Sequence, residues 1–170
     1  DYLETSPLGR AEWIKFFGLL YGKEVEADSI FTEVEKNYTE LRDKIGVLSS
    51  APVVISELKS GSAWYMPGGK SYMARFFKDA GAAYPWSDNT ETGSIPLSFE
   101  TVFNRAGKAD IWLIKSFHVS ELSYRTLQKE YAPYARFKAF REKKIYGCDS
   151  SRCNYYEETP FRPDLLLQEL

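Results

Sequence analysis

The apolar positions of the first 45 residues recur every three or four residues, the period of an α-helix. Ser6 is a suitable N-cap and Pro7 suits the first helical position, so we predict a helix from Pro7 that ends before Gly22. Residues 24–45 are predicted to form a second, amphipathic helix, in which acids and lysines separate the apolar side chains. At 1.5 Å per residue this helix is roughly 30 Å long, a length that suggests a strut.

After Gly46 short apolar runs alternate with stretches of helical spacing. The runs predict strands at 52–58, 82–86, 109–117 and 144–149. The other stretches predict helices at 72–81, 97–108 (Ser98 as N-cap), 120–131, 132–143 (starting at Pro133) and 158–170 (Thr159 as N-cap). Strands that alternate with helices predict an α/β fold, a Rossmann-like lobe with a small parallel sheet flanked by helices. The boundary with the preceding all-helical part lies near residues 46–51.

Aromatic side chains concentrate in the segments that follow the predicted strands. We predict a loop at 62–69, which ends in Pro-Gly-Gly and turns the chain tightly into the next helix. Ligands of open parallel sheets bind outside the carboxyl ends of the strands. The candidate ligand-binding residues in these segments are Trp64, Tyr65, Phe117, His118, Arg152, Asn154, Tyr155 and Tyr156. This mixture suits a large ligand with flat apolar parts and polar or anionic groups, although each aromatic ring could instead pack over its own loop.

Composition narrows the classes of function. The net charge of the 170 residues is −2 with both signs interspersed, so no basic stripe favours nucleic acid. No apolar run approaches the roughly 18 residues that would suggest a membrane span. Aromatic residues make up 16% of the chain, which permits an aromatic core, a binding surface, or both. Because the first residue is Asp1 rather than Met, we expect a processed or cut piece of a longer chain.

Cys148 and Cys153 bracket the short segment CDSSRC. A small-loop disulfide and two free thiols are both compatible with this spacing, while a metal site would need more ligands than the single histidine, His118, can add.

Catalytic motifs are incomplete. The segment MPGGKS has only the tail of a phosphate-binding loop, and neither G-x-G-x-x-G nor G-x-S-x-G occurs. A catalytic triad would have to use His118, which is more simply a polar residue at a strand end. We therefore predict no catalytic set, no cofactor and no metal.

Four segments, 6–28, 64–88, 93–114 and 162–170, resemble the helical-backbone (class III) periplasmic substrate-binding proteins of ABC importers. That family captures ferric siderophores, haem and cobalamin in a cleft between two α/β lobes that one long helix joins. The resemblance implies that residues 1–23 end an N-terminal lobe, residues 24–46 form the backbone helix and residues 51–170 form the C-terminal ligand-binding lobe.

The resemblance also implies partners and a location. The protein would bind a metal chelate in the periplasm or another extracytoplasmic space, with or without a lipid anchor, and deliver it to an ABC permease in the membrane. Glu100 matches the exposed Glu that docks onto permease arginines in this family. A carboxylate in a first helical turn is favoured by the helix dipole and stays available to an arginine. Without the resemblance, the simpler interpretation of Glu100 is an ordinary helix-start residue, whereas the resemblance favours docking.

Two other classes of protein remain as alternatives. An enzyme on the same two-lobe scaffold, such as a metal-chelatase-like lobe, needs His, Cys or acidic residues that converge on a metal or substrate. A pure interaction module would have lost its ligand and would have a small, polar cleft.

Overall fold

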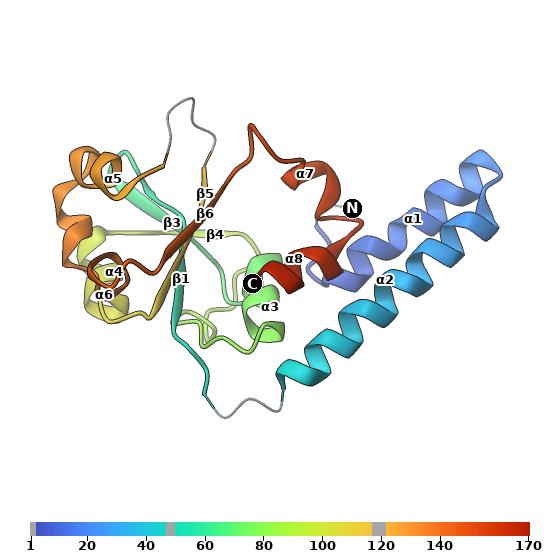
Figure 1. Cartoon of the computed structure of the whole chain (residues 1–170), viewed down its shortest axis with the longest axis horizontal. Helices are drawn as coiled ribbons and strands as arrows, with labels where there is room; N and C mark the ends of the chain where they lie inside the picture. Colours follow the sequence, from blue (N-terminus) through green and yellow to red (C-terminus); the bar gives the residue numbers. More distant parts are fainter. Residues whose placement is uncertain (1–2, 47–49, 117–121) are drawn as a thin grey trace.

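A computed structural model describes residues 3–46, 50–116 and 122–170. The first two helices, α1 (Pro7–Tyr21) and α2 (Glu24–Ile45), form an antiparallel hairpin that projects to one side of the molecule (Figure 1). Ser6 caps α1 by accepting a hydrogen bond from the Gly9 N–H at 3.2 Å. Gly22 ends α1 with φ of 63°, a left-handed conformation that glycine adopts without steric cost. Both predicted helices are confirmed.

The rest of the described chain contains two small sheets. The parallel sheet has the order β1-β5-β6 and consists of β1 (Val54–Ser56), β5 (Ile111–Ser116) and β6 (Ile145–Asp149). The antiparallel sheet has the order β2-β3-β4 and consists of β2 (Lys59–Ser60), β3 (Ala63–Pro67) and β4 (Ser94–Leu97). The predicted α/β fold with a small parallel sheet flanked by helices is confirmed.

Short helices surround the sheets. They are α3 (Tyr72–Asp79), α4 (Phe99–Ala106), α5 (Tyr124–Glu130), the 3₁₀-helix η1 (Ala132–Arg136), α6 (Lys138–Arg141), α7 (Tyr155–Glu158) and α8 (Pro163–Glu169). Ser71, Ser98 and Ser123 cap α3, α4 and α5, and each accepts a hydrogen bond from the backbone N–H three residues ahead.

Several predicted boundaries were wrong. Residues 62–67 were predicted as a loop, but most of them form β3. Residues 82–86 contribute only one isolated bridge, between Ala83 and Val53, because the chain there turns around Pro85. The helix predicted at 132–143 is broken at Phe137, whose extended backbone inserts a fully buried ring into the core. Thr159 follows α7 rather than capping the last helix, which starts at Pro163.

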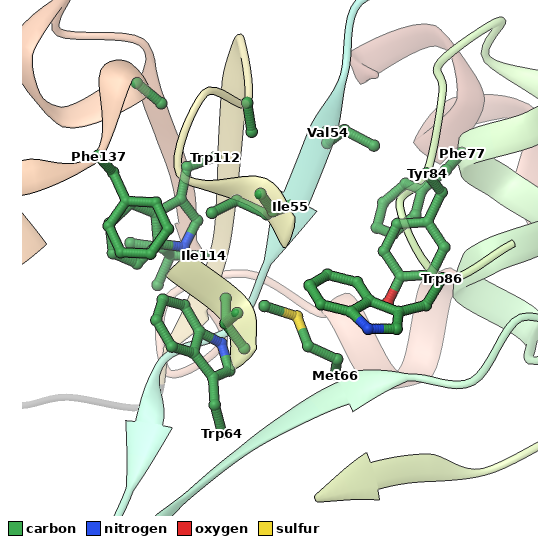
Figure 2. Packing of buried hydrophobic residues seen from close by; sticks show 14 of the residues in the cluster. Val54, Ile55, Trp64, Met66, Phe77, Tyr84, Trp86, Trp112, Ile114 and Phe137 are labelled. Carbon is green, nitrogen blue, oxygen red and sulfur yellow. The ribbon is translucent and has the colours of Figure 1, made fainter. Parts of the chain in front are cut away.

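Aromatic residues build the main core. Trp64, Tyr134 and Phe137 pack around Trp112, with ring centroids 5.1–5.4 Å from it. Figure 2 shows Trp64, Trp112 and Phe137 beside Ile114, with Met66 between Trp64 and Trp86. This core joins the two sheets and holds the carboxyl end of β1 in place.

A separate small cluster seats α2 on the lobe. Tyr38, Phe76 and Leu167 are buried there, and the Tyr38 hydroxyl donates to the buried carboxylate of Asp79 at 2.8 Å. The other half of α2 packs on α1 through Phe31 and Val34. The long helix is therefore anchored to the lobe near its C-terminal end.

Candidate functional site

The carboxyl ends of the three parallel strands meet at one edge of the sheet. Register pairs Ser56 of β1 with Leu113 of β5, and Lys115 of β5 with Cys148 of β6. A cavity of about 720 Å³ extends from the first residues of β5 and β6 to this edge of the sheet, between the strands and helices α3 and α8. Apolar side chains line most of it, and its polar lining includes Ser56, Glu57, Lys115, Cys148, Tyr155 and Glu169.

Glu57 has an unusual backbone conformation. Its φ is 63°, in the left-handed region that non-glycine residues rarely adopt. The Glu57 N–H donates to the Leu113 carbonyl at 3.0 Å, and the Glu57 carbonyl accepts from the Trp112 indole at 2.9 Å. Trp64 donates to the preceding carbonyl, that of Ser56, at 3.0 Å. Two core tryptophans thus hold the strained backbone at Glu57. Strained backbone conformations are found most often at functional sites.

The side chain of Glu57 is half-buried and faces a cation. Burial raises the pKa of its carboxyl group, and the nearby Lys115 ammonium opposes the shift. The two charged groups lie 3.9 Å apart, a loose ion pair that a ligand group could enter.

Lys115 also lies beside two aromatic rings. Its ammonium is 5.2 Å from the centroid of Tyr155 and 5.3 Å from that of Tyr156, within cation–π range. The Tyr155 hydroxyl donates to the Met73 sulfur at 3.4 Å, and burial raises the pKa of this phenol, so it stays protonated. Tyr156 is 60% exposed and packs edge-on against Tyr155.

Ser56 adds a polar group at the same strand end. Its Oγ is buried and has no hydrogen-bond partner in the part of the chain that the structure describes. An unpaired buried hydroxyl is costly, which again marks this end of β1 as unusual.

The sequence-predicted ligand residues are distributed unevenly. Trp64 is fully buried in the core, so the prediction that it walls a ligand cleft was wrong, because β3 turns its ring inward. Tyr65, its neighbour on β3, is 49% exposed but does not line the cavity. Phe117 and His118 lie outside the described residues.

The remaining predicted residues lie after β6. Arg152 and Asn154 are exposed in the turn before α7, and the Arg152 Nε is 3.6 Å from the Asp149 carboxylate. Tyr155 and Tyr156 begin α7 and join the site through Lys115.

Sequence reasoning missed Ser56, Glu57 and Lys115. Ser56 and Lys115 belong to the strands themselves, and Glu57 follows β1 directly. The signal was available, since each is a polar residue at the carboxyl end of an apolar run.

The two cysteines are free thiols beside this site. Their sulfur atoms lie 3.5 Å apart. The pKa of Cys148 is raised to about 11, mainly by burial and secondly by the hydrogen bond with Cys153. Among the described residues no group of three or more His, Cys, Asp or Glu side chains could hold a metal ion.

Glu100 lies on a different element. It is exposed in the first turn of α4, where Ser98 accepts a hydrogen bond from the Thr101 N–H at 3.1 Å. No helix within the described ranges is long and apolar enough to span a membrane.

Sequence comparisons match this chain to a family described as "Periplasmic binding protein", over residues 1–151. An "uncharacterized lipoprotein" of Methanocaldococcus jannaschii is 31% identical over all of this chain and 40% of its own length. A second lipoprotein of that organism is 27% identical over 85% of this chain and 38% of its own length. The chain therefore spans about two fifths of the length of these curated relatives.

Solved structures with the same fold include the following three proteins. A possible iron-binding (periplasmic solute-binding) protein of Staphylococcus epidermidis has a TM-score of 0.74 at 18% identity, covering 98% of this chain and 61% of its own. An ABC-type Fe³⁺-hydroxamate transport system protein of Saccharomonospora viridis has a TM-score of 0.73 at 13% identity, covering 94% of this chain and 52% of its own. IsdE of S. aureus, complexed with haem, has a TM-score of 0.70 at 19% identity, covering 96% of this chain and 65% of its own. At these identities the likeness shows the fold.

Proposed function

The chain belongs to the periplasmic binding protein family, and from this membership we propose that it is the ligand-binding lobe and backbone helix of an ABC importer's substrate-binding component. Residues 1–23 then end an N-terminal lobe, residues 24–46 are the connecting helix and residues 51–170 are the C-terminal lobe. The protein binds and releases its ligand and catalyses no reaction, as is usual for a substrate-binding family.

The proposed ligand is a metal chelate: a ferric siderophore, haem or a corrinoid. The observation that carries this proposal is Lys115, which lines a largely apolar cavity and has its ammonium beside two tyrosine rings. Such a site accepts an anionic oxygen of the chelate while the rings cover its flat or apolar part. The structural neighbours described as Fe³⁺-hydroxamate and haem proteins support the same ligand class.

The proposed ligand-binding residues range from those near the cavity to those farther from it. Lys115, Tyr155 and Tyr156 form the centre of this group, and Glu57 offers hydrogen bonds at the strand end. Arg152 and Asn154 contribute polar groups from the rim, and Tyr65 an exposed ring on β3; Phe117 and His118 remain candidates from the sequence alone. Trp64 is excluded because its side chain is fully buried.

We further propose that Glu100 docks the loaded protein onto its permease. Its support is the exposed position in the first turn of a capped helix, where a carboxylate is available to a partner's arginine. The place of action is extracytoplasmic, with or without a lipid anchor, and the name "lipoprotein" given to two relatives supports it.

The test is a titration of the intact protein with ferric siderophores, haemin and cobalamin, followed by tryptophan fluorescence. One member of the panel is expected to bind at sub-micromolar concentration. Lys115→Met is expected to weaken that binding about tenfold, the loss of one charged contact. Lys129→Met, which removes an exposed ammonium on α5, is the matched control and should bind normally.

Tight binding of a sugar or peptide, with none of the chelates bound, would overturn the proposed ligand class. An enzyme on the same scaffold would instead convert a ligand of the panel during the titration. An interaction module would leave the whole panel unbound.

A further inference from the structure

Cys148 and Cys153 are held in contact by the turn between them. The backbone N–H groups of Arg152 and Cys153 donate to the Asp149 carbonyl at 2.9 and 3.2 Å. Ser151 donates to the Asp149 carboxylate through its N–H at 3.0 Å and its hydroxyl at 2.6 Å. These hydrogen bonds close the turn without any bond between the cysteines, whose sulfur atoms lie 3.5 Å apart.

A disulfide requires a sulfur–sulfur distance of about 2.05 Å, so the two sulfurs need to approach by only about 1.5 Å. The turn therefore holds the two thiols close to bonding distance.

The pair lies beside the proposed ligand site. Cys148 lines the cavity and is paired in register with Lys115. Cys153 precedes Tyr155 by two residues, and that ring is 5.2 Å from the Lys115 ammonium. A bond between the two sulfurs would tie the start of the tyrosine segment to the end of β6.

The two thiols differ in access. Cys153 is exposed, whereas Cys148 is half-buried. An oxidant in solution therefore reaches Cys153 first, and Cys148 is placed to attack second.

We propose that Cys148 and Cys153 are a reactive dithiol, which low-molecular-weight disulfides such as oxidised glutathione convert to an intrachain disulfide. The Cys153 thiolate attacks one sulfur of the oxidant, forms a mixed disulfide and releases one small thiolate. Cys148 then loses its proton and attacks the Cys153 sulfur, which releases the second small thiol. The protein loses two electrons and two protons, and the oxidant becomes two thiols.

The bond has a consequence for binding that rests on the proposed function. Fixing the segment that carries Tyr155 and Tyr156 removes conformational freedom that ligand binding would otherwise have to remove. The oxidised protein is therefore expected to bind its ligand several-fold more tightly than the reduced protein.

The chemical test counts thiols. The intact protein is equilibrated in glutathione buffers of increasing oxidised fraction, alkylated with N-ethylmaleimide and weighed by mass spectrometry. The wild type is expected to pass from two alkylated thiols to none, as a monomer without bound glutathione. Cys148→Ser should instead accumulate a glutathione adduct on Cys153. A circular-dichroism melt of each variant confirms that it is folded.

Two results would overturn the dithiol. One is a wild type that keeps two alkylated thiols in a buffer that modifies Cys148→Ser. The other is a stable mixed disulfide or a disulfide-linked dimer as the wild-type product.

The binding arm compares oxidised and reduced protein with the chelate found in the titration. The double variant Cys148→Ser/Cys153→Ser is the control and should show no redox dependence. Equal affinities of the two wild-type forms would refute the effect on binding. A panel that fails to bind at all would count against the proposed function, while the thiol count still decides the dithiol.

Discussion

Glu57 shows how much one residue can reveal about a site. Its left-handed backbone costs about 1–2 kcal/mol for a residue with a Cβ, and this cost persists because Trp112 and Leu113 fix the peptide groups on either side. A glycine would adopt the same conformation at lower steric cost. The carboxylate is therefore a better explanation than the turn for the residue found here.

Glu57→Gly is expected to separate stability from binding. Relief of the left-handed strain offsets the entropy cost of glycine, so the free energy of unfolding should stay unchanged or rise by up to about 1 kcal/mol. Ligand affinity should fall about fivefold, because the hydrogen bond that the Glu57 carboxyl group offers the ligand is lost. Urea unfolding and fluorescence titration measure the two effects. Glu57→Gln keeps the strain and isolates the charge; a large loss of stability in Glu57→Gly would contradict this explanation.

Trp64 and Tyr65 are adjacent residues with opposite environments. Trp64 is fully buried against Trp112, while Tyr65 is about half exposed. Trp64→Ala is expected to lower the free energy of unfolding by about 3–5 kcal/mol, the usual cost of deleting a buried aromatic ring. Tyr65→Ala, on the other face of the same strand, should cost less than about 1 kcal/mol. Similar losses for both variants in urea unfolding would show that Trp64 is not a core residue.

At the scale of elements, the sequence predicted the helices and strands that have a long hydrophobic pattern. The two N-terminal helices have caps and many periodic positions, and β5 has a long apolar run, so all three were predictable. The antiparallel sheet was missed because β2 and β4 have two and four residues, too few for a pattern. In β3 the alternation of buried Trp64 and Met66 with exposed Tyr65 is that of a strand, but the Pro-Gly-Gly that follows favoured a loop.

The position of the candidate site was predictable from the sequence, but not all of the residues that form it. The rule for strand ends located the tyrosines after β6, and the same rule applied inside the strands would have found Glu57 and Lys115. The inward turn of Trp64 depends on packing between two sheets, which a single sequence does not reveal.

Helices α2 and α8 are joined by one buried carboxylate. Asp164 of α8 receives two hydrogen bonds from Arg162, at 2.9 and 2.8 Å, and one from Asn37 of α2 at 3.4 Å. Burial alone would raise the pKa of Asp164, but these hydrogen bonds hold it below its usual value.

A lowered pKa means that the carboxylate stabilises the fold at neutral pH. This contribution is complete above the unfolded pKa of about 4 and is lost as the pH falls through the lower folded value. Asp164→Asn is therefore expected to lower the free energy of unfolding at pH 7 by about 1–3 kcal/mol. The difference from wild type should narrow below about pH 4, which urea unfolding at several pH values measures. A difference that stays constant down to pH 3 would contradict the role of the charge.

At the scale of the whole molecule, binding and delivery are proposed to use different elements. Most of the proposed ligand residues lie near the ends of β1, β5 and β6, whereas Glu100 lies on α4. Figure 1 shows α4 and α7 on different sides of the parallel sheet.

Glu100→Gln is therefore expected to leave ligand affinity unchanged and to reduce delivery about tenfold, the effect of one charge-assisted contact. Uptake of the ligand by vesicles that contain the permease measures delivery, and fluorescence titration measures affinity. Glu130→Gln, an exposed carboxylate at the end of α5, is the control. Unchanged uptake with Glu100→Gln would refute the docking role.

Helix α3 contacts α2 and also lines the cavity. Phe76 packs against Tyr38 of α2, with ring centroids 6.1 Å apart, while its neighbour Phe77 lines the cavity. The Tyr38–Phe76–Leu167 cluster therefore joins the hairpin to the same helix that lines the cavity. Two consecutive side chains of one short helix connect α2 to the cavity wall, so a substitution at either position alters the packing of both.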